Sequence, residues 1–170
     1  SASVKTIEGI VPLRIIDGVT TNPSLLAKET GQPTEILRQI CEAVKGPVSA
    51  EVVATDANEM IREGKQLAAI NEHIVVKVPF GKDGVKACAA LASEGIRVNV
   101  TLVFSASQAI LAAKVGATFV SPFVGRIDDL ATDGMALIAQ IMEIYENYDF
   151  GTEVLVASVR GPLHVVEAAR

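Results

Sequence analysis

The chain has 170 residues, 49% of them hydrophobic, and a formal net charge of −5 at pH 7. This length fits one domain. With no Trp, five Phe and two Tyr, the core must consist of Val, Ile, Leu and Ala, which is typical of a parallel sheet covered by helices. The acidic charge, without a basic stripe or aromatics set between Arg and Lys, excludes nucleic acid from the expected partners.

No apolar run reaches membrane-spanning length, and no signal peptide opens the chain. Cys41 and Cys88 fall in helical patterns and are expected to be free core thiols, which suits a reducing compartment. We therefore expect a cytoplasmic protein with no membrane partner. His73 and His164 lack the spacing of metal ligands, so we assign neither a role and expect no metal and no cofactor.

Six apolar runs have the pattern of strands and alternate with helical patterns. The runs cover residues 14–19, 48–54, 74–79, 97–104, 119–124 and 153–159. Between them, Asp56 and Ser105 are expected to cap helix starts, and Gly95 and Gly116 to follow helix ends. Residues 34–44 place their apolar side chains on one helical face. Because no linker interrupts this alternation, we predict one domain, residues 1–170, with a parallel sheet.

A parallel α/β sheet is either doubly wound or closed into a barrel. Polar residues near the carboxyl ends of the strands favour a barrel, where active sites are built from several strands at once. The chain also lacks a Gly-rich dinucleotide fingerprint after its first strand. Six strands are too few for a (β/α)8 TIM barrel, which usually needs about 200 residues or more. The chain is therefore either an incomplete barrel or another α/β fold.

Lys77 lies within the run 74–79, which is expected to be buried on both faces. Burial disfavours the charged form of an amine, and a free amine attacks carbonyls to form a Schiff base. The alternative is a lysine that reaches solvent or pairs with a carboxylate. Glu51, in the preceding run, is an obvious partner. Their pairing would be either structural or that of a general acid/base beside a nucleophile.

Other polar residues stand at the ends of predicted strands. Asn22 is a candidate donor to a substrate hydroxyl, but an Asn before Pro also forms turns by itself. Asn99 and Thr101 alternate, so both face one side of their strand and indicate a lined pocket. The same alternation relates three residues of the fifth run and its continuation, namely Ser121, Phe123 and Gly125.

Two arginines follow the last two predicted strands. Arg126 comes after the fifth run, and Arg160 follows Ser158 at the end of the sixth. Arginine forks, a hydroxyl and backbone donors on one rim are suited to a phosphate group. The alternative for each arginine is a surface salt bridge, for example between Arg126 and Asp128 or Asp129. For the cluster as a whole we favour phosphate.

Five motifs that occur in order also resemble a known family. They read DGVTTNPS at 17–24, VVKVP at 75–79, NVTLVF at 99–104, SPFVGRI at 121–127 and ASVR at 157–160. Together they resemble a small single-domain transaldolase of the class I aldolase family, which also contains fructose-6-phosphate aldolase. The resemblance covers essentially the whole chain. It implies a (β/α)8 barrel, a lysine Schiff base with a ketose phosphate, and a homo-oligomer, either a pentamer or a decamer of stacked pentamers.

The resemblance also implies roles for individual residues. Lys77 takes the Schiff-base position, and Glu51 and Thr101 take positions that move protons through a water. The implied substrate-binding residues are Thr20, Asn22, Asn99, Ser121 and Phe123, with Arg126, Ser158 and Arg160 for the phosphate. Aldolases tend to have Gln and Tyr where this chain has Glu51 and Phe123. Both differences favour a transaldolase, because Phe donates no hydrogen bond to the water that would release dihydroxyacetone.

The function implied is transfer of a dihydroxyacetone unit from sedoheptulose 7-phosphate or fructose 6-phosphate to an aldose phosphate, in the pentose phosphate pathway. The alternatives are a dihydroxyacetone aldolase and a non-catalytic barrel fragment. Family members open with a strand ending in an Asp that serves carbon–carbon cleavage, and residues 1–4 here resemble the segment just after it. Residues 167–170 fall in the helix before an eighth strand. We expect a trimmed form of a longer protein, rather than a fragment unable to perform the reaction.

Overall fold

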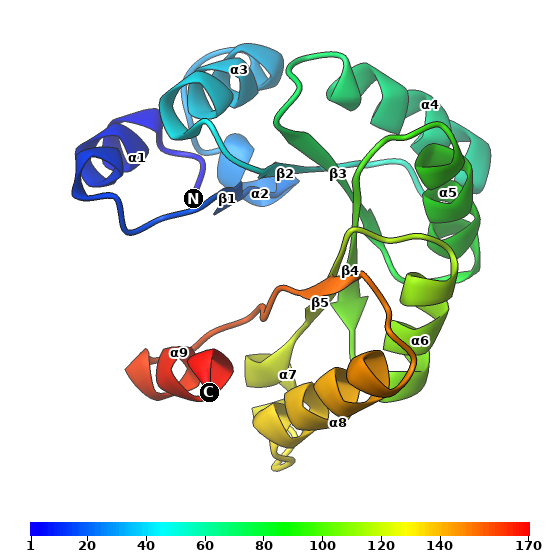
Figure 1. The fold of residues 1–170 in the computed structure, drawn as a ribbon. Coiled ribbons are helices and arrows are strands. Elements are labelled where there is room, and N and C mark those ends of the chain that lie inside the picture. Colours follow the sequence, from blue (N-terminus) through cyan, green and yellow to red (C-terminus); the bar gives the residue numbers. More distant parts are fainter.

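The computed structural model describes residues 1–170 as a curled sheet with helices along its outer side (Figure 1). All strand pairs are parallel, and the strands follow one another in chain order. This arrangement is a half-barrel, and it confirms the predicted α/β class and the incomplete (β/α)8 barrel. The strands are β1 (Val19–Thr20), β2 (Val48–Glu51), β3 (Ile74–Pro79), β4 (Val98–Val103), β5 (Phe119–Pro122) and β6 (Glu153–Val154).

Helices connect successive strands, as the alternating pattern predicts. Their bounds are α1 (Val4–Ile10), η1 (a 3-10 turn, Val11–Leu13), α2 (Pro23–Leu26), α3 (Pro33–Val44), α4 (Ala57–Ala68), α5 (Lys82–Ser93), α6 (Ala106–Lys114), α7 (Val124–Asp128), α8 (Gly134–Asn147) and α9 (Pro162–Ala169). Asp56 and Ser105 cap α4 and α6 with their side chains. Gly95 and Gly116 follow α5 and α6 with φ of 78° and 87°, a region that glycine enters without steric cost. None of the helices is long and apolar enough to cross a membrane.

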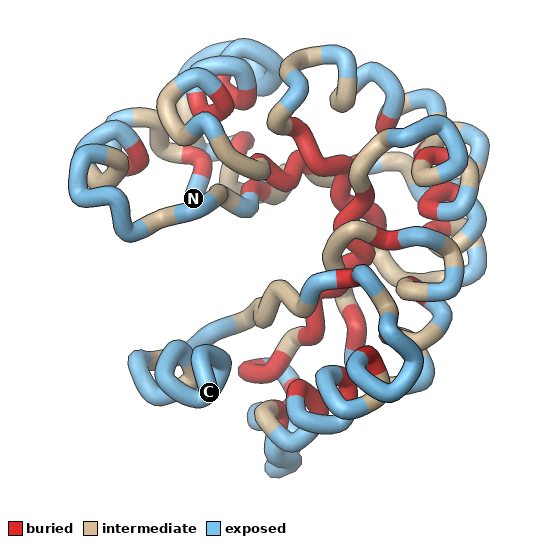
Figure 2. Tube along the Cα trace, viewed as in Figure 1, coloured by how far each residue is buried: buried red, intermediate tan, exposed pale blue.

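The core lies between the sheet and the helices that cover it (Figure 2). Nearly all residues of β2, β3 and β4 are buried, because helices cover the outer face of each strand and its inner face lines the barrel interior. The largest fully buried side chains of the core are aliphatic, as the composition requires. Cys41 in α3 and Cys88 in α5 are buried free thiols, and burial raises their pKa to about 11 and about 12.

The sheet does not close. β1 and β6 each pair with one neighbour only, so they are the unpaired edges expected of an incomplete barrel. In Figure 1, α1 and α9 lie on either side of the opening in the arc. The sheet edges and these two helices therefore form the sides of the opening.

Five of the six predicted strands are too long. The second ends at Glu51 rather than at residue 54, and the fourth is one residue shorter at each end. Residues 14–18 are not strand: Arg14 follows η1 with φ of 54°, and pairing with β2 begins only at Val19. The fifth strand ends at Pro122 because α7 begins two residues later. The sixth pairs at Glu153–Val154, then only through an isolated bridge between Ala157 and Phe123. Strand hydrogen bonds require a neighbour in register, which an apolar run alone does not guarantee. Helix α1, which Ser3 caps, and the short helix α7 were not predicted from the sequence.

Candidate active site

Lys77 and Glu51 are register partners at the carboxyl ends of β3 and β2. The Nζ of Lys77 donates a hydrogen bond to Oε2 of Glu51 at 2.9 Å and a longer one, 3.4 Å, to the main-chain oxygen of Thr21. The two side chains are only 10% and 18% exposed. Charges that are mostly buried interact more strongly than charges in water. The pair expected from the sequence is therefore formed, and it is largely buried.

Asn99 follows Lys77 in the next strand, since the two residues are register partners in β3 and β4. Its Nδ2 donates to Oγ of Ser49 at 3.2 Å, and its Oδ1 accepts from Oγ of Ser121 at 2.9 Å. Asn99 is fully buried and does not line the cavity described below. Contact between its side chain and a substrate hydroxyl stays a prediction. Within the chain, its Oδ1 orients the Ser121 hydroxyl.

Thr101 lies two residues further along β4 on the same face. Its hydroxyl is buried and has no hydrogen-bond partner in the protein. The strand is irregular here: the register shifts between Val100 and Val103, and Leu102 has φ of 58°. Because buried polar atoms are nearly always paired, an unpartnered hydroxyl at a cavity wall indicates a place for a ligand atom.

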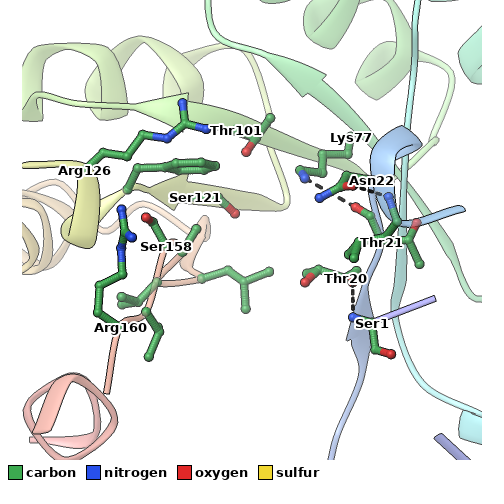
Figure 3. A pocket seen from close by; sticks show the side chains of 16 residues that line it. Ser1, Thr20, Thr21, Asn22, Lys77, Thr101, Ser121, Arg126, Ser158 and Arg160 are labelled. Carbon is green, nitrogen blue, oxygen red and sulfur yellow. Dashed lines mark hydrogen bonds between the residues drawn. The ribbon is translucent and has the colours of Figure 1, made fainter. Parts of the chain in front are cut away.

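A cavity of about 620 Å³ opens above these residues at the carboxyl ends of the strands (Figure 3). Nine of the predicted site residues line it, although they come from distant parts of the chain. They are Thr20, Asn22, Lys77, Thr101, Ser121, Phe123, Arg126, Ser158 and Arg160. The other two predicted residues do not line the cavity: Glu51 is hydrogen-bonded to the lining residue Lys77, and Asn99 is buried behind the wall. The sequence thus predicted most of the wall.

The cavity wall is cationic. Its lining includes Lys77 and two arginines but no carboxylate. No cluster of three or more His, Cys, Asp or Glu side chains is placed to hold a metal ion. The wall is therefore suited to an anionic ligand.

Seven further lining residues were not predicted from the sequence, namely Ser1, Thr21, Leu25, Leu155, Val156, Ala157 and Val159. Thr21 contacts Lys77 through its backbone carbonyl, an atom that every residue carries and that leaves no signal in the sequence. Its neighbour Asn22 caps α2, since its Oδ1 accepts from the amide of Leu25 at 2.8 Å. The turn role considered for Asn22 is therefore present, while its amide nitrogen makes no hydrogen bond within the chain.

The two arginines lie on the same side of the cavity in Figure 3. Arg126 follows β5, as predicted, but belongs to the short helix α7, and its Cζ is 5.0 Å from the ring centre of Phe123. It has no carboxylate within ion-pair distance, so the salt bridge considered for it is wrong. Arg160 does form one, with Asp129 at 2.7 Å, between side chains that are more than half exposed.

Solved structures with a similar fold are distant in sequence. The recombinant flavin-binding domain of baker's yeast flavocytochrome b2 matches with a TM-score of 0.66 at 15% identity, over 98% of this chain and 50% of that chain. A mandelate racemase/muconate lactonizing protein from Herpetosiphon aurantiacus has a TM-score of 0.63 at 16% identity, over 98% and 46%. The chain thus spans about half the length of these structures, and the likeness concerns the fold alone.

Sequence relatives are much closer. A probable transaldolase of Desulfatibacillum aliphaticivorans is 61% identical over 170 residues, which cover 99% of this chain and 79% of the relative. One from Myxococcus xanthus is 58% identical, over 100% and 77%. The family described as Transaldolase/Fructose-6-phosphate aldolase matches residues 1–170. The chain therefore belongs to the transaldolase/fructose-6-phosphate aldolase family of enzymes.

Proposed function

We propose that this protein is a transaldolase that transfers a dihydroxyacetone unit between sugar phosphates through a Schiff base on Lys77. The proposed donors are sedoheptulose 7-phosphate and fructose 6-phosphate, the acceptor is an aldose phosphate, and the setting is the pentose phosphate pathway. The observation that carries the proposal is the environment of Lys77. Its side chain is only 10% exposed and borders a cationic cavity, and its amine is hydrogen-bonded to one carboxylate.

The first step forms the imine. Lys77 transfers a proton to Glu51, 2.9 Å away, and its free amine attacks the C2 carbonyl of the ketose. The resulting carbinolamine oxygen takes up that proton and a second one from nitrogen, then leaves as water, so one C–O double bond is exchanged for one C–N double bond. Thr101, whose hydroxyl is unpartnered at the wall, is proposed to hold the water that carries these protons.

The second step breaks the bond between C3 and C4. A base removes the C4 hydroxyl proton, the aldose product leaves, and the electron pair of the broken bond moves toward the imine nitrogen. The resemblance assigns this base to the Asp that ends the first strand of family members. The three-carbon enamine then attacks the acceptor aldehyde, and hydrolysis of the new imine returns the free lysine.

The phosphate is proposed to bind at Arg126, Ser158 and Arg160. Arg126 supports this because its guanidinium has no carboxylate partner and its Cζ lies 5.0 Å from the ring centre of Phe123, which leaves its donors for an anion. To bind the phosphate, Arg160 would give up its exposed ion pair with Asp129 or keep it and bind the phosphate with its remaining donors. Thr20, Asn22 and Ser121 are proposed for the sugar hydroxyls, and Asn99 is proposed to act through Ser121. The cytoplasmic location and the homo-oligomer expected from the resemblance stay proposals.

The test is reductive trapping in the full-length protein. Borohydride added with fructose 6-phosphate should reduce the imine and label the peptide that contains Lys77, as read by mass spectrometry. Lys77→Met should abolish labelling, whereas Lys82→Met, at the exposed start of α5, should label like the wild type. Labelling at another lysine, or none in the wild type, would disprove the Schiff-base proposal.

A further inference from the structure

His164 joins two elements that carry the cavity's arginines. It lies in the first turn of α9, and its side chain is 16% exposed. Its Nδ1 accepts a hydrogen bond from the backbone amide of Arg160 at 3.1 Å. Its Nε2 lies 2.9 Å from Oδ2 of Asp128 in α7. One imidazole therefore bridges the segment of Arg160 and the helix of Arg126.

The carboxylate at the far end of this bridge is itself fixed. Oδ1 of Asp128 accepts from the amide of Gly134, the first residue of α8, at 2.9 Å. The neighbouring Asp129 accepts from the guanidinium of Arg160 at 2.7 Å. Arg160 is thus held twice against the end of α7, by its side chain through Asp129 and by its backbone through His164.

The hydrogen bonds assign one protonation state to the imidazole. Nδ1 accepts from an N–H group, so it carries no proton, and Nε2 must then hold the proton that it donates to Asp128. This is the neutral Nε2–H form. An added proton would occupy Nδ1 and face the Arg160 amide, donor against donor, which would break that link while keeping the contact with Asp128.

We propose that His164, in this neutral form, is a positioning residue for the phosphate site. It fixes the backbone of Arg160 to α7, so that the guanidiniums of Arg160 and Arg126 keep one mutual geometry for a phosphate. The inference rests on the proposed phosphate site.

A purely local role is the competing explanation. The N-cap of α9, Gly161, has no side chain to cap the helix, so the bond from the Arg160 amide to His164 could serve only the start of α9. The contact with Asp128 distinguishes the two explanations, because a local cap does not need it.

Two variants separate the halves of the bridge. In His164→Asn, Oδ1 takes the place of Nδ1 and accepts from Arg160, but the shorter side chain does not reach Asp128. In His164→Gln, the amide nitrogen still reaches Asp128, but no acceptor is left at the Arg160 amide. We expect both to raise KM for fructose 6-phosphate by about 2- to 10-fold, the effect of one hydrogen bond outside the phosphate site itself, with kcat within about twofold. Asp128→Asn, whose Oδ1 still accepts from Gly134, should act alike.

A substrate without phosphate provides a second measurement. Reductive trapping with dihydroxyacetone, which has no phosphate, should proceed at the wild-type rate in all three variants.

The outcomes distinguish this proposal from the proposed function. If Arg160→Ala leaves KM for fructose 6-phosphate unchanged, the phosphate site is wrong and this inference falls with it. If Arg160→Ala raises KM but His164→Asn matches the wild type, His164 is only a local cap and this inference alone is overturned. Loss of dihydroxyacetone trapping in the His164 variants would also overturn it, because the effect would then not be confined to phosphate.

Discussion

The amide of Gly125 in α7 donates a hydrogen bond to the carbonyl oxygen of Ser158 at 3.1 Å. A β-carbon at position 125 would lie 2.1 Å from that oxygen. The absence of a side chain therefore lets α7 approach the segment after β6. This approach brings Arg126, on α7, to the same side of the cavity as Arg160.

Gly125→Ala should push these two segments apart. Because the obstacle is backbone, we expect a loss of about 1–3 kcal/mol of stability, as for other overpacked sites, and a rise of about tenfold or more in KM for fructose 6-phosphate. Thermal unfolding and steady-state kinetics measure the two effects. Gly151→Ala is the matched control, since a β-carbon there meets nothing within 4 Å. Wild-type kinetics in Gly125→Ala would mean that this close approach does not matter for the site.

Removal of either arginine should weaken phosphate binding. If a charge-assisted hydrogen bond contributes about 1.5–3 kcal/mol, Arg126→Ala and Arg160→Ala should each raise KM for phosphorylated sugars by about 10- to 100-fold. The larger effect is expected for Arg126, because Arg160 must first give up part of its contact with Asp129. Arg38→Ala, which removes an exposed pair with Glu35 in α3, is the control. Unchanged KM in both cavity variants would exclude them from the phosphate site.

Glu51→Gln should slow imine formation. The amide keeps the shape of the side chain but cannot take the proton from Lys77, and positioned acid–base groups typically contribute about 10²- to 10⁴-fold. Rapid-mixing reductive trapping with fructose 6-phosphate measures the rate directly. Glu59→Gln, at an exposed pair on α4, should behave as wild type. A trapping rate in Glu51→Gln close to that of the wild type would show that Glu51 only pairs with Lys77.

Phe123→Tyr should change the fate of the enamine and leave phosphate binding alone. The ring still supports Arg126, so KM for fructose 6-phosphate should stay within about twofold. The added hydroxyl can orient a water toward the bound carbanion, which should speed release of dihydroxyacetone relative to transfer. The assay compares transfer from fructose 6-phosphate to erythrose 4-phosphate with cleavage in the absence of an acceptor. If the wild type cleaves without acceptor as fast as it transfers, the protein is an aldolase.

The buried thiols should make stability depend on pH only on the alkaline side. Burial raises the pKa of Cys41 to about 11 and of Cys88 to about 12, from an ordinary value of 9.0. Above pH 9 the unfolded state binds fewer protons at these thiols than the folded state, so the free energy of unfolding falls as pH rises.

By this argument, each thiol should remove about 1–2 kcal/mol between about pH 8 and pH 10.5, at 1.36 kcal/mol per pKa unit. Urea unfolding at the two pH values tests this, with Cys88→Ala as the comparison. The variant should lose less stability than the wild type over this interval. An equal loss in both proteins would mean that Cys88 does not contribute.

The sequence by itself determined much of this protein. Helix α3 and the caps of α4 and α6 followed from periodicity and from residue types, which act over a few residues. The adjacency of Lys77 and Glu51 also followed, because successive parallel strands in a barrel are usually neighbours. The same rule placed the ends of β1, β3, β4 and β5 at one edge, which is why most of the cavity wall could be predicted.

Only the tertiary structure decided the pairing between distant segments. The side-chain amide of Asn99 is hydrogen-bonded to Ser49 and Ser121. Asp129 pairs with Arg160 rather than with Arg126. His164 in α9 contacts Asp128 in α7. Such partners depend on strand register and on how closely helices approach, which the spacing of residues along the chain does not encode. For the same reason, the apolar runs at the two ends of the sheet were predicted as full strands, although each has a neighbour on one side only.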